Sequence, residues 1–278
     1  MLLETVLEHT ARTLPVYGCA ALGGIVAERS GVIHLGLEAI VLTSALAASM
    51  TALATGSFVL ALLAALLVGA LLGALHGGLS TIGRVDDVVS GLALNMAALA
   101  GTRVILRRVY GSSSNSPTFT GDDPSAWVWA LGLGVLTLGV HGMLVRTRFG
   151  LALRAAGSAP HAARSAGIDV ARVRIVAVAL GSALAGLSGL ALAFDQHQFQ
   201  SGMSGGRGFV ALVIGIVSRR RPGAALLASI TFALLEALDA SLQGRTPVPS
   251  ELLSAMPYLA TLLALAVFGW RRDPHKSV

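Results

Sequence analysis

The interval RAAGSAPHAARSAGIDVARVR, from Arg154 to Arg174, decides the organisation of this chain because it is a long basic stretch between strongly apolar blocks. Its centre is rich in alanine. Ser158 is a possible N-cap, Pro160 suits the first helical turn and Gly167 suits a helix end. We therefore expect a short surface helix over about residues 159–165, held between two apolar spans and able to dock a soluble partner.

The composition places the chain in a membrane. It has 278 residues, of which 54% are hydrophobic and 12% are charged, whereas soluble domains average about 25% charged residues. The apolar blocks of about 18 to 23 residues are long enough to cross a hydrocarbon core of roughly 30 Å. We predict an all-α, polytopic transmembrane helical bundle of about eight or nine spans, including broken or re-entrant helices. We expect one transmembrane domain over residues 1–278, with a cytoplasmic segment at about 154–172.

The order of apolar and polar segments gives the expected spans. Residues 102–125 are polar and should form a loop, and residues 208–217 are too short to cross alone, which predicts a re-entrant or half-broken helix. The remaining apolar runs are 14–27, a run ending near 54, 58–79, 88–101, 126–145, 175–194, 223–242 and 252–270.

The arginines set the orientation. If the Arg154 to Arg174 interval lies in the cytoplasm, most of the 20 basic residues fall on that side, as the positive-inside rule requires. Because the arginines sit at span ends, they suit lipid headgroups rather than nucleic acid. Cys19 is the lone cysteine, so no disulfide can form within the chain. The N-terminus lacks the basic region of a cleavable signal peptide, and we expect the first span to be retained.

Two residues near the first polar break are candidates for a solute pathway. The segment ERSGVIHLGLE, residues 28–38, places His34 and Glu38 beside glycines and next to an apolar run. A carboxylate in the membrane usually faces a polar cavity or a partner, and glycines permit unwound backbone that can bind a solute. The alternative is that Glu38 lies at the interface and is solvated.

Three further residues are candidates on other segments. Asn95 lies within the fourth span, where an amide could bind a base or sugar, or could join two helices. Arg207 and Phe209 open the short segment, where the cation could meet an anionic or carbonyl group and the ring could stack on a solute. The alternative there is a tight re-entrant turn with a snorkelling arginine.

The sequence Gly186-Leu187-Ser188-Gly189 matches the G-x-S-G of rhomboid-type intramembrane proteases. Such an enzyme needs a histidine at the same membrane depth, and none is well placed. We favour a packing face made of Gly181, Ala185 and Gly189. The chain contains no Walker A sequence, so it cannot bind ATP by a P-loop, and we predict no cofactor or metal site.

Several ordered motifs together resemble a known family. Residues 155–189, AAGSAPHAARSAGIDVARVRIVAVALGSALAGLSG, resemble the signature of inner-membrane permeases of the branched-chain amino acid, ribose and nucleoside ABC importers. Residues 28–38, residues 84–95 (RVDDVVSGLALN) and residues 205–212 are similar to segments of the nucleoside-type permeases, of which the shorter subunit is the most similar. This chain departs from those segments at three places: His34 stands where the family usually has Asn, Ala39 stands where Gly is usual, and Asp86-Asp87 replace Asn-Glu.

The resemblance implies a multi-pass bacterial inner-membrane subunit that hydrolyses nothing. A separate cytoplasmic ATPase would bind the coupling segment, a second homologous permease would complete a heterodimer, and an extracytoplasmic binding lipoprotein would deliver a nucleoside, base or sugar. The coupling residues would be Ser158, Pro160, Ala163, Arg164 and Gly167.

Two other classes compete with the importer. An ion-coupled secondary transporter needs membrane-buried titratable groups, of which we identify only Glu38. A scaffold without a substrate would tolerate the replacement of Glu38 and Asn95.

Overall fold

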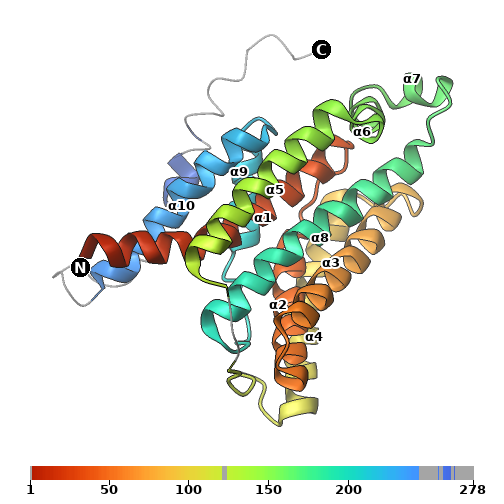
Figure 1. Ribbon diagram of the computed structural model, residues 1–278. Coiled ribbons are helices and arrows are strands. Elements are labelled where there is room, and N and C mark those ends of the chain that lie inside the picture. The colour runs from red at the N-terminus through yellow and green to blue at the C-terminus, as the bar shows by residue number, and fades with distance from the viewer. Residues whose placement is uncertain (1, 121–123, 244–255, 257–258, 264–265, 267–278) are drawn as a thin grey trace.

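The computed structural model describes residues 2–120, 124–243, 256, 259–263 and 266, and these residues form helices joined by turns and loops (Figure 1). The described part contains no β-strand, only an isolated bridge between Asn115 and Gln200. The helices are α1 (Leu2–Arg29), α2 (Leu37–Thr55), α3 (Phe58–Thr81), α4 (Asp87–Tyr110), α5 (Ala126–Arg146), α6 (Arg148–Ser158), α7 (Pro160–Ser165), α8 (Val170–Gln196), α9 (Arg207–Val217) and α10 (Pro222–Leu242).

The prediction of an all-helical membrane bundle is confirmed, but the count of eight or nine spans is not. Six described helices are long and apolar enough to cross a membrane: α2, α3, α4, α5, α8 and α10. Helix α1 contains the predicted first span, with Glu4, Glu8 and Arg12 in its earlier turns. The predicted last span, 252–270, lies largely outside the described residues. Helix α9 has 11 residues and is therefore about 16 Å long, which is too short to cross, as expected.

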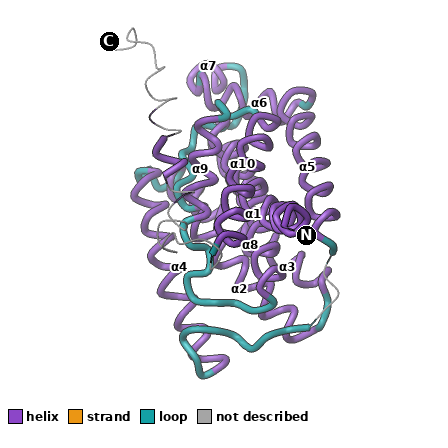
Figure 2. The backbone as a smooth tube through the Cα atoms, turned by 90° about the vertical axis from the view of Figure 1, so that its left-hand side faces the viewer, coloured by secondary structure: helices purple, strands orange, loops and turns teal. Residues whose placement is uncertain are grey.

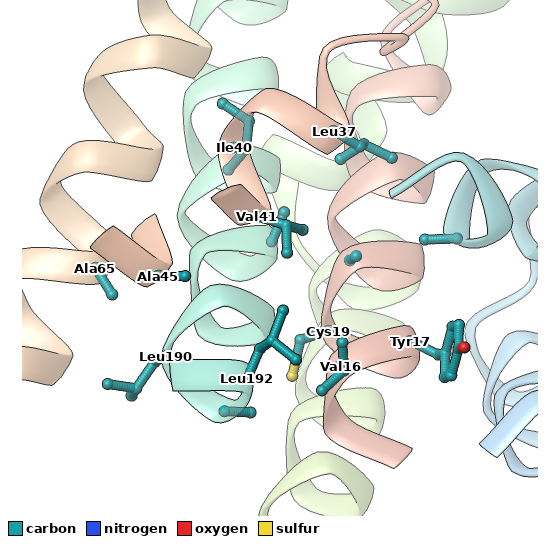
Figure 3. Close-up of a cluster of buried hydrophobic side chains, with 14 of the residues drawn as sticks. Val16, Tyr17, Cys19, Leu37, Ile40, Val41, Ala45, Ala65, Leu190 and Leu192 are labelled. Atoms are coloured by element: carbon teal, nitrogen blue, oxygen red, sulfur yellow. The ribbon is translucent and has the colours of Figure 1, made fainter. Parts of the chain in front are cut away.

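Helix α8 is the centre of the bundle, with α1, α2 and α3 packed around it (Figure 1). The C-terminal half of α8, from Gly181 to Phe194, is almost wholly buried. A close-up of the buried core shows Leu190 and Leu192 of α8 among side chains of α1 and α2, such as Val16 and Val41 (Figure 3). Pro15 lies inside α1, where it removes one backbone hydrogen bond. Helix α1 changes direction along its length (Figure 1), as a proline inside a helix favours.

Glycines allow the backbones around α8 to approach closely. A Cβ atom at Gly181 would lie 2.4 Å from the carbonyl oxygen of Gly23 in α1, and one at Gly189 would lie 2.4 Å from that of Val41 in α2. A Cβ atom at Gly69 of α3 would lie 2.5 Å from the carbonyl oxygen of Ser182. Small residues at helix interfaces are how membrane helices gain van der Waals contact without a hydrophobic driving force. The predicted packing face on α8 is therefore confirmed.

The two ends of the bundle differ in their connections. Helices α6 and α7 lie at one end, and the long loop after α4 lies at the other (Figure 2). That loop pairs with the end of α8 through Ser116 and Phe119, whose N–H groups donate to Phe199 and His197 over 2.9 Å each. The expected loop over 102–125 was too long, because α4 continues to Tyr110 and ends on Gly111, which has φ +72°.

Candidate functional site

The site is built around a break between α1 and α2, residues 30–36, which carries Gly31 at φ +92°. Glycines there permit unwound backbone, as expected, but this backbone is not left open to a solute. Side chains from other elements bind its polar groups. Arg174 donates to the Ser30 carbonyl over 3.1 Å, and Asp87 accepts from the Ile33 N–H over 2.9 Å. His76 lies 3.3 Å from the Ile33 carbonyl oxygen, and Asn95 donates to the Leu35 carbonyl over 3.1 Å.

Asn95 joins three elements. Its Nδ2 bonds the Leu35 carbonyl as described, and its Oδ1 accepts from the backbone N–H of Ala39, in the first turn of α2, over 2.9 Å. The Ala39 N–H has no acceptor within α2, because the first N–H groups of a helix have no partner in that helix. Asn95 of α4 therefore caps the beginning of α2 from outside. The structure thus shows the interhelical hydrogen bond that was the predicted alternative for this residue.

Glu38 caps a different helix. It lies in the first turn of α2, and its two carboxylate oxygens accept from the backbone N–H groups of Gly206 and Gly208 over 2.8 Å each. Gly206 is the N-cap of α9, with φ +84°, and no side chain of the α9 segment caps that helix. A carboxylate at a helix N-terminus satisfies orphan donors and also complements the helix dipole. Glu38 therefore holds the start of the short helix against α2.

Glu38, Asn95 and Phe209 line one cavity of about 410 Å³. The three residues come from α2, α4 and α9, and Phe209 exposes 42% of its surface. The rest of the wall is mainly apolar, with Leu42, Leu92, Met96 and Leu99 from α2 and α4, and Gly202, Ser204 and Gly205 from the turn before α9. An apolar cavity with a few convergent polar groups is the usual form of a small-molecule site.

His34 and Arg207 do not line that cavity. The His34 side chain is fully buried, its Nε2 lies 2.6 Å from the Ser182 Oγ of α8, and its ring stacks on that of His76 at 5.0 Å between centroids. His34 therefore fixes the break between α1 and α2 to α8 and α3 rather than pointing toward open space.

Arg207 forms an ion pair with Glu236 of α10, and Tyr17 of α1 donates to the other oxygen of that carboxylate over 2.6 Å. Arg207 is therefore not a snorkelling cation. The prediction that Glu38 is the only membrane-buried titratable residue is wrong, because the Glu236 side chain is only 15% exposed within a predicted span. Two carboxylates inside the apolar run 223–242, Glu236 and Asp239, were the signal for it.

Comparison with known proteins decides the family. The family model for the branched-chain amino acid transport system permease component matches residues 6–268. The chain belongs to this family of ABC transporter permease components. It is 30% identical to the guanosine ABC transporter permease protein NupQ of Bacillus subtilis, over 92% of this chain and 89% of that protein. It is 31% identical to the nucleoside ABC transporter permease protein NupC of Lactococcus lactis, over 89% of this chain and 87% of that protein.

The fold of the permease agrees with that family. A solved structure described as "an inward-facing conformation of a putative metal-chelate type ABC transporter" matches it with a TM-score of 0.57 at 15% identity, over 95% of this chain and 85% of that chain. The permease is thus a multi-pass protein of the bacterial inner membrane and a transport component, not an enzyme. Its family associates with an ATPase subunit and a substrate-binding protein, and the ion-coupled alternative is not favoured.

The segment expected to bind the ATPase forms helices α6 and α7. Helix α7 covers Pro160–Ser165, as predicted, and Gly167 follows at φ +82°. Ser158 is not the N-cap, because it ends α6 and its Oγ donates to the Arg154 carbonyl. Ala163 is buried against α6 and α8, whereas Arg164 and Gly167 are exposed.

Ser188 lies in a contact between two helices, as the packing alternative predicts. It is fully buried in α8, and its Oγ lies 3.4 Å from the Pro15 carbonyl oxygen of α1. That contact joins α8 to α1, so Ser188 belongs to the packing of the two helices.

Proposed function

We propose that the permease moves nucleosides, or a related sugar or base, and that the solute passes through the cavity lined by Glu38, Asn95 and Phe209. The observation that carries this proposal is that residues from α2, α4 and α9 meet on one mainly apolar cavity of about 410 Å³. Relatives whose names specify guanosine or nucleosides support the choice of solute.

The chemistry of the cavity suits a nucleoside. The exposed ring of Phe209 and the apolar wall offer a face on which a base can stack. Each oxygen of Glu38 accepts one backbone hydrogen bond and keeps a lone pair that can accept from a sugar hydroxyl. The half-exposed Asn95 amide lies beside it. His34 and Arg207 contribute by holding the unwound segments in place.

Uptake through Phe209 variants tests this proposal. In cells that carry the complete transporter, we expect Phe209→Ala to raise the KM for radiolabelled guanosine about tenfold, because stacking of a base on an aromatic ring contributes ~1–3 kcal/mol. Phe209→Trp keeps a stacking surface and should stay close to wild type. Uptake should stop when ATP is depleted with the proton gradient intact.

Unchanged guanosine uptake in Phe209→Ala would place the pathway elsewhere. If only ribose uptake responds to deletion of the permease, the solute is a sugar. Uptake that persists without ATP would favour ion coupling.

We further propose the assembly in which this permease works. A second homologous permease completes a heterodimer in contact with membrane lipid, each chain contributing eight or nine crossings. Helix α7 docks on the ATPase through its exposed face. Arg164 and Gly167 contact the ATPase, and Ser158, Pro160 and Ala163 hold the helix in its position on the permease. The small buried contact of Ala163 with Ala156 and Val170 supports a positioning role for Ala163, because this contact would transmit a displacement of α7 to α8.

Reversing one charge on α7 tests the docking. We expect Arg164→Glu to lower the amount of ATPase subunit that co-purifies with the permease several-fold, because the substitution reverses the charge of an exposed side chain at the proposed contact. Arg107→Glu makes the same change on an exposed arginine at the end of α4, at the other end of the bundle, and should leave the ATPase bound. Equal recovery of the ATPase with both variants would refute the docking through α7.

A further inference from the structure

A second cavity, of about 660 Å³, lies between α5 and α10 and is separate from the proposed pathway. Its lining divides into a basic part and an apolar part. The basic part contains Arg29, Arg154 and Arg221, which lie at the end of α1, in the middle of α6 and in the turn before α10. These elements lie at the end of the bundle that carries α6 and α7 (Figure 1).

The three arginines are not neutralised within the described part of the chain. Glu28, the nearest carboxylate in sequence, pairs with Arg220 over 3.1 Å. Arg29 donates to the Arg220 carbonyl over 2.8 Å and is repelled by the guanidinium groups of Arg154 and Arg221. Like charges held close together without an acidic partner favour an anion between them.

The first turn of α10 adds backbone donors to the same place. Pro222, Gly223 and Ala224 line the cavity, and no side chain caps the helix. The N–H groups of Gly223 and Ala224 belong to the first turn, which has no acceptor inside the helix, and such groups bind phosphate well. The basic side chains and the backbone donors thus point to the same kind of group.

The apolar part of the cavity extends along the two spans. Leu138 and Val145 of α5 and Leu227 of α10 line it, and they expose 73%, 56% and 67% of their surfaces. Both helices are candidate membrane spans, so a bilayer would surround these side chains with hydrocarbon rather than water. A soluble anion would leave this wall uncovered, whereas an acyl chain would cover it.

We propose that this cavity binds one anionic glycerophospholipid. The phosphate lies among Arg154, Arg221 and the first turn of α10, and an acyl chain lies in the groove between α5 and α10. Because the groove contacts the junction of α1, α6 and α10, a bound lipid ties the spans to the segment that leads into α7. The proposal does not depend on the solute that the permease carries.

Native mass spectrometry of the purified transporter tests the site, with phosphatidylglycerol as the anionic probe and phosphatidylcholine as the zwitterionic one. We expect one phosphatidylglycerol to bind at least tenfold more tightly than phosphatidylcholine, and Arg221→Gln to weaken it about tenfold, because a charge-assisted contact is lost. Arg219→Gln is the matched control: it removes the same charge from the same Arg-Arg-Arg run, and Arg219 does not line the cavity.

A steric variant distinguishes the groove from a general charge effect. A side chain at Gly223 would meet nothing within 4 Å, so Gly223→Trp can enter the cavity without disturbing the packing. It should displace phosphatidylglycerol although no charge is changed.

Three results would overturn the proposal. One is equal binding of the two lipids, and another is equal weakening by Arg221→Gln and Arg219→Gln. The third is displacement of phosphatidylglycerol by millimolar inorganic phosphate, which would show a site for a soluble anion only.

Discussion

Replacement of Glu38 by alanine should reduce solute uptake by at least tenfold while the permease still reaches the membrane. The substitution removes both acceptors of the Gly206 and Gly208 N–H groups, which lie 2.8 Å from the carboxylate. An unsatisfied buried donor costs about 1–3 kcal/mol, so the start of α9 should move away from α2. That movement displaces Phe209 and changes the wall of the proposed pathway. Uptake of radiolabelled guanosine measures the effect.

Two variants make the Glu38 result specific. Glu38→Gln keeps one carbonyl oxygen as an acceptor and should fall between wild type and Glu38→Ala. Glu8→Ala removes a carboxylate that pairs with Arg12 on an exposed turn of α1, where an ion pair contributes little. If Glu38→Ala and Glu8→Ala transport equally well, the cap on α9 is not needed for transport.

Replacement of Gly189 by valine should largely prevent folding. The first atom of the new side chain would lie 2.4 Å from the Val41 carbonyl oxygen and 2.6 Å from the Ala45 backbone nitrogen. Both are backbone atoms of α2, so relief requires α2 and α8 to separate, and overpacking of this kind costs about 1–3 kcal/mol or more. The yield of monodisperse protein after detergent extraction measures the loss.

Gly132→Val is the matched control for this prediction. Gly132 is an exposed residue of the span α5, and a Cβ atom there meets nothing within 4 Å. The same change of side chain should therefore leave the yield near that of the wild type. Equal yields from Gly189→Val and Gly132→Val would show that the close approach of α2 and α8 is not required.

Local features of the sequence were enough to predict the membrane class, most of the described helices and the short helix α7. Hydrophobic length, proline and glycine act over a few residues, so their effect can be inferred without knowing the neighbours of a segment. The length of α4 was predicted less well, because its last turns carry Arg103, Arg107 and Arg108 and look like a polar loop. Those arginines lie on exposed positions of a helix that extends past the apolar run.

The candidate residues were identified by their chemistry, but their partners could not be. The bonds of Glu38 join residues 168 and 170 positions apart, and Asn95 reaches Leu35 across 60 positions. Periodicity cannot specify which faces of two distant helices meet. The sequence therefore determined by itself that this is a helical membrane permease with one helix too short to cross and a short helix, α7, in a basic segment. Only the tertiary structure decided that Glu38 caps α9, that Asn95 caps α2 and that Arg207 pairs with Glu236, because buried donors and charges are satisfied by whichever groups the packing of glycine-lined helices brings within reach.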